Sequence, residues 1–204
     1  MQPDPPIPDR WTPAEIDGVL TFLRAAEQLK QTLRSSHTSL GRPESVAEHS
    51  WRLCLMAILL CDAFPEVDFG KLIRMCVVHD LGEAIGGDIP AVAQNAAASK
   101  SARERRDLLH ILGPLPDRLR AELLALWDEY DAAASTEARI ARALDKLETI
   151  LQHNQGKNPP GFNYWFNLQY GRQYTTCHPL IAAIREILDQ ETMRRASEVR
   201  ETSG

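Results

Sequence analysis

Apolar residues recur at intervals of three and four positions along most of the chain, which is the spacing of one face of an α-helix. No segment alternates apolar and polar residues over any length in the manner of a β-strand, and no segment repeats another. The pattern therefore predicts an all-α bundle of about six core helices plus a C-terminal helix. The expected helices span residues 13–29, 45–63, 69–85, 99–112, 117–130 and 135–151, and the last begins near 179.

Two of the predicted helices begin with a capping box, in which a Ser or Thr and a Glu three residues later satisfy each other's backbone amides. Thr12 with Glu15 begins the first helix, and Ser45 with Glu48 begins the second. The second helix is apolar on nearly every side from residue 53, so we expect it in the centre of the bundle. Two consecutive glycines, at 86–87, end the third helix.

The length of 204 residues and the 44% of hydrophobic side chains suit one domain with a sizeable core. We expect this domain to span 11–195, between a proline-rich disordered tail at 1–10 and a frayed C-terminal tail at 196–204. The net charge of −5 and the lack of a Lys/Arg block argue against a nucleic-acid polymer as partner. A small phosphorylated ligand remains compatible, because a metal ion and one or two cations can bind a phosphate locally.

The four cysteines form no CxxC pair, and three of them lie in apolar helical segments, as expected of buried thiols in a reducing cytoplasm. The first ten residues, MQPDPPIPDR, lack the features of a signal peptide. The longest apolar stretch, at 53–61, is too short to span a bilayer. The sequence therefore predicts a cytoplasmic protein without a membrane partner.

Four polar residues interrupt helices that are otherwise apolar. They are His49 in the second helix, His79 and Asp80 near the end of the third, and Asp145 in the sixth. An unpaired carboxylate in a core is costly, so such residues on three helices indicate a shared partner. Two imidazoles and two carboxylates suit one divalent first-row metal ion: Mn, Fe, Co, Ni or Zn. Because no thiolate takes part, the pattern does not indicate a closed structural zinc site.

Each of these residues also has a simpler interpretation. A single histidine on an apolar helix face is more often a hydrogen-bonded core residue than a metal ligand. The adjacent pair His79 and Asp80 favours the metal, because helical neighbours point about 100° apart and both reach one ion only beside a groove. Glu83, four residues after His79, either holds that imidazole in place or orients and deprotonates a water molecule. We interpret three other histidines as core or surface residues: His110, His153 and His178.

The order H…HD…D, together with four longer segments, resembles the HD-domain metal-dependent phosphohydrolase superfamily and, within it, the 5′-deoxynucleotidases. The segments are RPESVAEHSWR, VVHDLGEAIGGDIP, LWDEYDAAASTEARIARALDKLE and the aromatic stretch that ends in HP. The dipeptide HD alone is a weak signal, whereas the four segments in this order are a strong one. The resemblance extends from about residue 29 to residue 188.

This resemblance implies both an activity and a set of site residues. The implied activity is hydrolysis of the 5′-phosphate of deoxyribonucleoside monophosphates, with one divalent metal ion as cofactor and a small nucleotide as partner. The implied metal ligands are His49, His79, Asp80 and Asp145. Glu83 and Asp88 match the catalytic carboxylates of the family, and Arg34 matches an arginine that contacts the substrate phosphate. In this scheme Asp88 either protonates the leaving oxygen or binds the sugar hydroxyl.

The chain departs from the family just after Arg34. Relatives carry a tryptophan near this arginine and a loop about two residues longer, whereas residues 35–37 are Ser, Ser and His here. The departure leaves base and sugar selectivity open. On the residues alone, Arg34 can also be a solvated charge at a helix end, and Asp88 can cap a following helix.

Two other functions stay open from the sequence: an HD-domain hydrolase for another small phosphomonoester or nucleotide, and a metal- or nucleotide-binding module without turnover. A second metal ion is poorly supported, because only His110 lies between the HD pair and Asp145. We interpret the aromatic stretch at 162–174 as cover for the core in preference to a dimer surface, and it can also wall a nucleobase pocket. A homodimer is expected from the family resemblance only.

Overall fold

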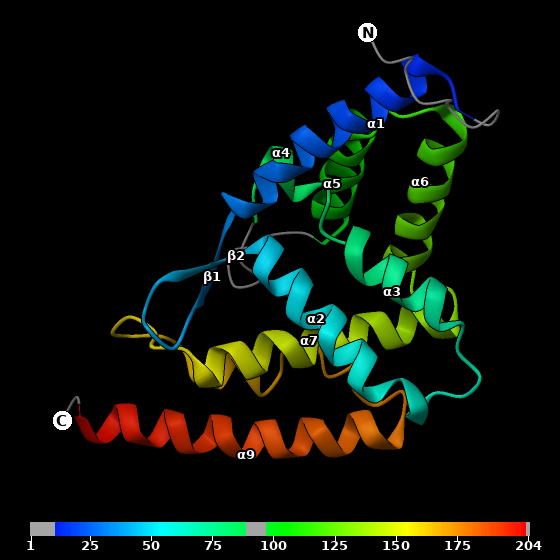
Figure 1. Ribbon diagram of the computed structural model, residues 1–204. Helices are drawn as coiled ribbons and strands as arrows, with labels where there is room; N and C mark the ends of the chain where they lie inside the picture. The colour runs from blue at the N-terminus through cyan, green and yellow to red at the C-terminus, as the bar shows by residue number, and fades with distance from the viewer. Residues whose placement is uncertain (1–10, 89–96, 203–204) are drawn as a thin grey trace, which may run out of the picture.

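The computed structural model describes residues 11–88 and 97–202. Helices dominate it, as Figure 1 shows, and the all-α class is confirmed. The α-helices are α1 (Pro13–Ala26), α2 (Val46–Leu60), α3 (Phe69–Val78), α4 (Glu83–Gly86), α5 (Ala97–Ile111), α6 (Asp117–Asp131), α7 (Thr136–Gln155), α8 (Tyr164–Asn167) and α9 (Pro179–Thr202). Short 3₁₀ turns follow α1 and α2, at η1 (Glu27–Lys30) and η2 (Cys61–Ala63). The tail at 1–10 lies outside the described residues.

Both predicted capping boxes are confirmed. The Thr12 hydroxyl accepts a hydrogen bond from the Glu15 amide at 3.2 Å, and the Glu15 carboxylate accepts one from the Thr12 amide at 2.8 Å. Ser45 and Glu48 form the same reciprocal pair at the start of α2. Each box satisfies two amides that a helix start otherwise leaves without partners, so both helices begin where the sequence predicts.

The segment between the first two predicted helices contributes to a two-stranded antiparallel sheet, although the sequence showed no strand-like alternation there. β1 (Leu33–His37) pairs with β2 (Pro43–Ser45). The strands are short, and their burial runs against hydropathy: Leu33 is 54% exposed, whereas Ser36 is buried. Backbone pairing rather than an apolar face holds this hairpin, so no alternation of hydrophobic residues could reveal it.

The predicted single helix at 69–85 is also wrong in part, because it breaks between Val78 and Glu83. The Glu83 amide bonds to the Asp80 carbonyl three residues back, at 3.0 Å, so the chain makes turns here before α4 begins. At Gly82 the backbone approaches α5 closely. A Cβ there would lie 2.5 Å from the Glu104 carbonyl oxygen. The break therefore lets α5 pack against this corner, and it places His79 and Asp80 at a helix end.

Helix α7 is the centre of the fold. It packs against α2 and α3 on one side and runs beside α9 on the other, as Figure 1 shows. The largest fully buried apolar side chains at this centre belong to α2, α3 and α7: Leu53, Leu72, Met75, Leu144, Leu147 and Ile150. Helix α9 continues to Thr202, past residue 195, where we expected the domain to end. Among the described helices, none combines the length and apolar character needed to cross a membrane.

Candidate metal and substrate site

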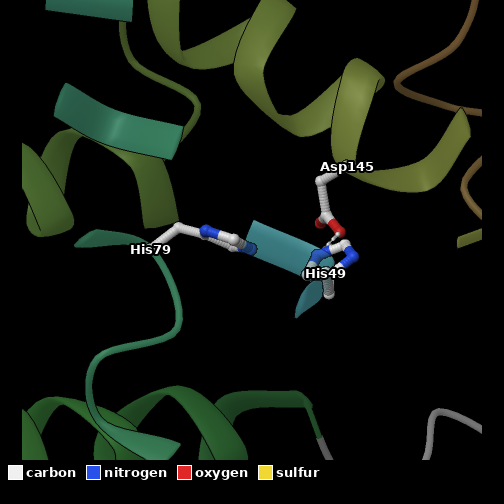
Figure 2. Close-up of side chains that lie close together, drawn as sticks. All are labelled: His49, His79 and Asp145. Atoms are coloured by element: carbon white, nitrogen blue, oxygen red, sulfur yellow. Dashed lines mark ion pairs between the residues drawn. The ribbon is translucent and has the colours of Figure 1, made fainter. Parts of the chain in front are cut away.

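Three of the four predicted metal ligands converge where α2, α3 and α7 meet. Figure 2 shows His79 and Asp145 approaching His49 from two sides. His49 lies on α2, His79 directly follows α3 and Asp145 lies on α7. One ligand atom from each lies within 4.8 Å of the other two, and all three side chains are buried.

Asp80 completes the group. Its Oδ2 lies 3.0 Å from Nε2 of His79 and 3.8 Å from Nε2 of His49. On the other side, Oδ1 of Asp145 lies 3.3 Å from Nε2 of His49. The structure thus brings together all four residues that the sequence singles out as ligands.

The hydrogen bonds of the two imidazoles fit a metal site. Nδ1 of His49 is bonded to Glu148, and Nδ1 of His79 donates to the Cys76 carbonyl at 2.9 Å. The Nε2 atom of each ring is buried and has no hydrogen-bond partner among the described residues. Metal-binding histidines use one nitrogen for the ion and fix the other by a bond of this kind. The donor set and its unsatisfied atoms therefore fit a divalent metal ion.

Neighbouring charges shift the pKa values of the residues in the cluster. Burial and Arg34 lower the pKa of His49, but Glu148 and Asp145 outweigh them and raise it to about 10. Burial raises the pKa of Asp80, yet His79 and His49 hold it well below the ordinary value. Asp145 is likewise ionised, because Lys146 and His49 outweigh its burial and lower its pKa. Two carboxylates that stay ionised in a buried site supply the negative charge a cation needs.

Several residues that support the cluster are absent from the sequence prediction. Glu148 bridges His49 and Arg52, whose Nε donates to Glu148 Oε1 at 2.7 Å. Tyr130 and Lys146 both donate to Oδ2 of Asp145, at 2.9 and 2.7 Å. One signal could have found Glu148: it lies three residues after Asp145, so it shares that helix face inside an apolar stripe. Tyr130 and Lys146 carry no such signal.

A second group of buried acids surrounds the same histidine. Ligand atoms of Glu44, His49 and Glu148 also lie within 4.8 Å of one another. Burial and the neighbouring Glu148 raise the pKa of Glu44 to about 7. Because His49 and Arg52 already satisfy Glu148, we assign this second group to support of the first rather than to a separate ion.

The two predicted catalytic carboxylates lie beside the cluster. Glu83 is buried, its Oε2 has no hydrogen-bond partner among the described residues, and its Oε1 lies 4.0 Å from the Lys100 ammonium. Burial, Asp80 and Asp88 raise the pKa of Glu83 well above the ordinary value. Burial also raises the pKa of Asp88, against the opposing effect of Arg34. The alternative in which Asp88 caps a following helix concerns residues 89–96, which lie outside the described residues.

Arg34 lies in β1 with its guanidinium turned into the protein. Its side chain is 10% exposed, Nη2 donates to Thr149 Oγ1 at 3.0 Å, and Nη1 lies 3.6 Å from Asp80 Oδ2. The alternative of a solvated charge at a helix end is therefore wrong. The hairpin that the sequence did not predict is what carries this arginine to the cluster.

A cavity of about 480 Å³ adjoins the cluster. Arg34, Asp80, Asp88, Lys100 and Asp145 line its charged part. The rest is lined mainly by the loop after α7 and by α8 and its continuation, including Phe162, Phe166, Asn167 and Tyr170. The aromatic stretch therefore walls a pocket, as one interpretation of the sequence proposed, while Tyr170 and Tyr174 also pack against the core.

Comparison with known proteins agrees with this geometry. The family model described as HD domain matches residues 26–185, and the chain belongs to the HD domain family. The 5′-deoxynucleotidase HDDC2 of Danio rerio is 32% identical over 88% of this chain and 90% of its own length. The mouse 5′-deoxynucleotidase HDDC2 is 34% identical over the same shares. Within the family, the resemblance to 5′-deoxynucleotidases is thus confirmed.

A solved structure has the same fold as this chain. The crystal structure of a predicted metal-dependent phosphohydrolase from Magnetospirillum magnetotacticum is 30% identical and superposes with a TM-score of 0.79. The match covers 93% of this chain and 97% of that one. The arrangement of helices around the cluster is therefore shared over nearly the whole length of both chains.

Proposed function

We propose that this protein is a metal-dependent hydrolase that removes the 5′-phosphate of deoxyribonucleoside monophosphates, releasing deoxynucleoside and phosphate. The observation that carries the proposal is the convergence of His49, His79, Asp80 and Asp145 beside a cavity. That cavity also holds an arginine for a phosphate and an aromatic wall for a base. The names of the matched relatives support the same reaction class.

The four converging residues would hold one divalent ion, of which Mn and Co are the first to test. When bound, such an ion offsets charge on the phosphoryl group and lowers the pKa of a water molecule toward neutrality. Phosphoryl transfer then depends mainly on positioning and electrostatics, which the remaining residues of the cavity supply.

Arg34 is the proposed phosphate contact. Its side chain is held on both flanks, by Thr149 at 3.0 Å and by Glu44 at 3.5 Å, so the guanidinium is fixed before a substrate arrives. A fixed planar guanidinium suits bidentate binding of phosphate oxygens. Arg34→Ala is expected to raise KM for a nucleotide more than it lowers kcat, whereas the control Arg120→Ala, on a side chain of α6 that is 38% exposed, leaves both unchanged.

Glu83 and Asp88 are the proposed proton-handling groups. One oxygen of the buried Glu83 carboxyl has no partner in the part of the chain that the structure describes, so it can accept a hydrogen bond from the attacking water and orient it. Asp88 lines the same cavity as Arg34, and burial raises its pKa. Because burial raises the pKa of Glu83 as well, the raised pKa of Asp88 does not choose between its two predicted roles, which are protonation of the leaving 5′-oxygen and binding of the sugar hydroxyl.

The test is a phosphate-release assay on the purified protein with dAMP, dGMP, dCMP, dTMP, dUMP and AMP, each with and without added Mn²⁺ or Co²⁺. Ser35 and Ser36 line the cavity where relatives carry a tryptophan, so AMP tests how far sugar selectivity survives. We expect metal-dependent release from deoxynucleotides that Asp80→Asn abolishes. Metal and nucleotide binding without release from any of these compounds would identify a binding module instead.

A homodimer is the assembly that we propose. A groove of about 800 Å³ between α1, α2 and α3 is lined by apolar side chains, of which Leu23 and Trp51 are 55% and 66% exposed. Arg24, Glu27 and Lys30 line the same groove, so a twofold axis can set unlike charges of two copies against each other. Light scattering on the protein and on Trp51→Glu tests it, with a dimer expected for the first and a monomer for the second.

A further inference from the structure

The cavity extends away from the charged cluster, and the role proposed here for that part rests on the function proposed above. One face of α7 connects the two parts. Asp145, Thr149 and His153 follow one another at intervals of four residues, so they lie in a row along the helix, and all three line the cavity. Eight residues of α-helix span about 12 Å. That span is comparable to the reach from the phosphate of a nucleoside monophosphate to the edge of its base.

His153 and Asn167 lie together beyond the charged part of this row. Nδ1 of His153 and Oδ1 of Asn167 are 2.9 Å apart, and both residues are buried. Burial and the nearby Arg34 outweigh the bond to Asn167 and lower the pKa of His153 to about 4, so its ring is neutral at neutral pH. A neutral ring that donates from Nδ1 presents Nε2 as an acceptor.

Two polar atoms of this pair are left without partners. Nε2 of His153 and Nδ2 of Asn167 are shielded from water and bond to nothing among the described residues. Buried polar atoms are usually satisfied, and an unsatisfied one costs about 1–3 kcal/mol. The pair thus offers one acceptor and one donor side by side. If the amide and the tautomer are both reversed, the pair still offers one donor and one acceptor.

We propose that His153 and Asn167 recognise the hydrogen-bonding edge of a nucleobase, so that the site is built for nucleotides rather than for base-free phosphomonoesters. Every common base presents a donor next to an acceptor on its pairing edge, which matches this pair. Phe162 packs edge to face on the His153 ring, with centroids 4.9 Å apart, and is only partly buried. Because Nε2 of His153 is shielded from water, a base that bonds to it requires the Phe162 ring to move aside, and Phe166, which also lines the cavity, can then pack on the base.

The first measurement uses the wild-type, metal-loaded enzyme. It compares kcat/KM for the five deoxynucleotides with kcat/KM for 2-deoxyribose 5-phosphate, which carries the phosphate and sugar without a base. A site with polar groups made for a base rejects a ligand that lacks it, so we expect at least about a 100-fold preference for the best nucleotide. Equal turnover of the base-free compound would overturn the inference while leaving a phosphohydrolase in place.

The second measurement uses His153→Phe, which keeps the ring and removes both nitrogens. We expect kcat/KM for the best nucleotide to fall roughly tenfold and that for 2-deoxyribose 5-phosphate to stay within twofold. Binding of the matching deoxynucleoside, measured by calorimetry, should weaken by the same factor. The matched control is His178→Phe, because His178 packs on Phe64 outside the cavity.

These results separate the two proposals. An equal fall for both substrates would show that His153 acts only through the fold, and the base-recognition proposal would fail. Release of phosphate from no nucleotide by the wild type would overturn the proposed function, and this inference with it. Thermal unfolding of each variant shows whether it folds. If His153→Phe does not fold, the wild-type comparison of nucleotides with 2-deoxyribose 5-phosphate can still overturn the base-recognition proposal.

Discussion

The two halves of α7 differ in the kind of polar group that they bury. Toward its middle, Asp145 and Glu148 are charged and lie near the imidazoles of His49 and His79 and the side chains of Lys146 and Arg52. Toward its end, His153 and Asn154 are neutral and bond to amide or carbonyl groups, Asn167 and the Leu188 backbone. One helix therefore buries ionised side chains at its middle and neutral polar side chains toward its end.

The difference shows how a single helix can orient an asymmetric ligand. Buried charges need a charged partner, so under the proposed function the middle of α7 would bind a cation and, through it, a phosphate. Neutral groups instead select by the direction of their donors and acceptors. A nucleotide has the same polarity, with a charged phosphate at one end and a neutral base at the other. The comparison predicts that mutations in the two halves fail in different ways.

The largest effect is expected at the charged half. Asp145→Asn keeps the size of the side chain but removes a charge from the proposed metal site. We expect metal content to fall and phosphate release to drop by about 10³-fold, the scale of removing a preorganised electrostatic group. Elemental analysis and the phosphate assay measure the two. Asp117→Asn, an exposed carboxylate on α6, is the control, and unchanged metal content in Asp145→Asn would contradict the assignment.

The neutral half should instead control how stability depends on pH. His153 has a pKa of about 4 in the folded protein and about 6.5 in the unfolded chain. Because the unfolded chain binds the proton first, stability is complete above pH 6.5 and declines as the pH falls toward 4. Between pH 7 and pH 4 the decline amounts to roughly 3 kcal/mol, or about 100-fold in the folding equilibrium.

Denaturant unfolding of the metal-free protein at pH 7 and pH 4 measures this decline. His153→Phe should lose less stability between the two pH values than the wild type by about that amount, whereas His178→Phe should follow the wild type. A decline of the same size in His153→Phe would mean that other groups cause it.

Sequence could predict the charged half but not the neutral one. His49, His79, Asp80 and Asp145 stand out because they interrupt apolar helices, and the family motif places them together. The hairpin that carries Arg34 has no readable pattern, since it buries Ser36 and exposes Leu33. The break at Gly82 allows the close approach of α5, and the sequence around Gly82 does not show that this later helix packs there.

His153 itself shows the limit. On the sequence it is interpreted as an ordinary core or surface histidine. The structure shows that it is buried and that, among the described residues, only one of its nitrogens has a hydrogen-bond partner. Its partner, Asn167, lies on α8, and nothing in the residues between them predicts that the two side chains meet.

Glu148→Gln sharpens the comparison by removing charge without removing the acceptor. Glutamine can still accept the bond from His49, so the imidazole should stay in place while its charged support is lost. Residues that orient metal ligands typically change metal affinity by 10–100-fold, and we expect about tenfold here. Calorimetric titration with Mn²⁺ measures this change, and excess metal should restore most of the activity. Activity that excess metal does not restore would assign Glu148 a different role.

The smallest effect is expected at Thr149, between the two halves of the row. Its hydroxyl accepts a bond from Arg34 and donates to the Asp145 carbonyl, each at 3.0 Å. Thr149→Val keeps the shape and removes both bonds, so Arg34 loses one of the groups that fix it. We expect KM for a deoxynucleotide to rise about fivefold, which corresponds to one hydrogen bond of about 1 kcal/mol, with little change in kcat.

Thr192→Val is the matched control for Thr149→Val, because Thr192 is a buried threonine on α9 that bonds to Asn154 and Leu188 and does not line the cavity. Binding of the free deoxynucleoside, which has no phosphate, should be unchanged in Thr149→Val. If deoxynucleoside binding weakens as much as KM rises, Thr149 belongs functionally to the base-binding half. The boundary between the two halves of α7 would then lie nearer Asp145 than the contacts of Arg34 indicate.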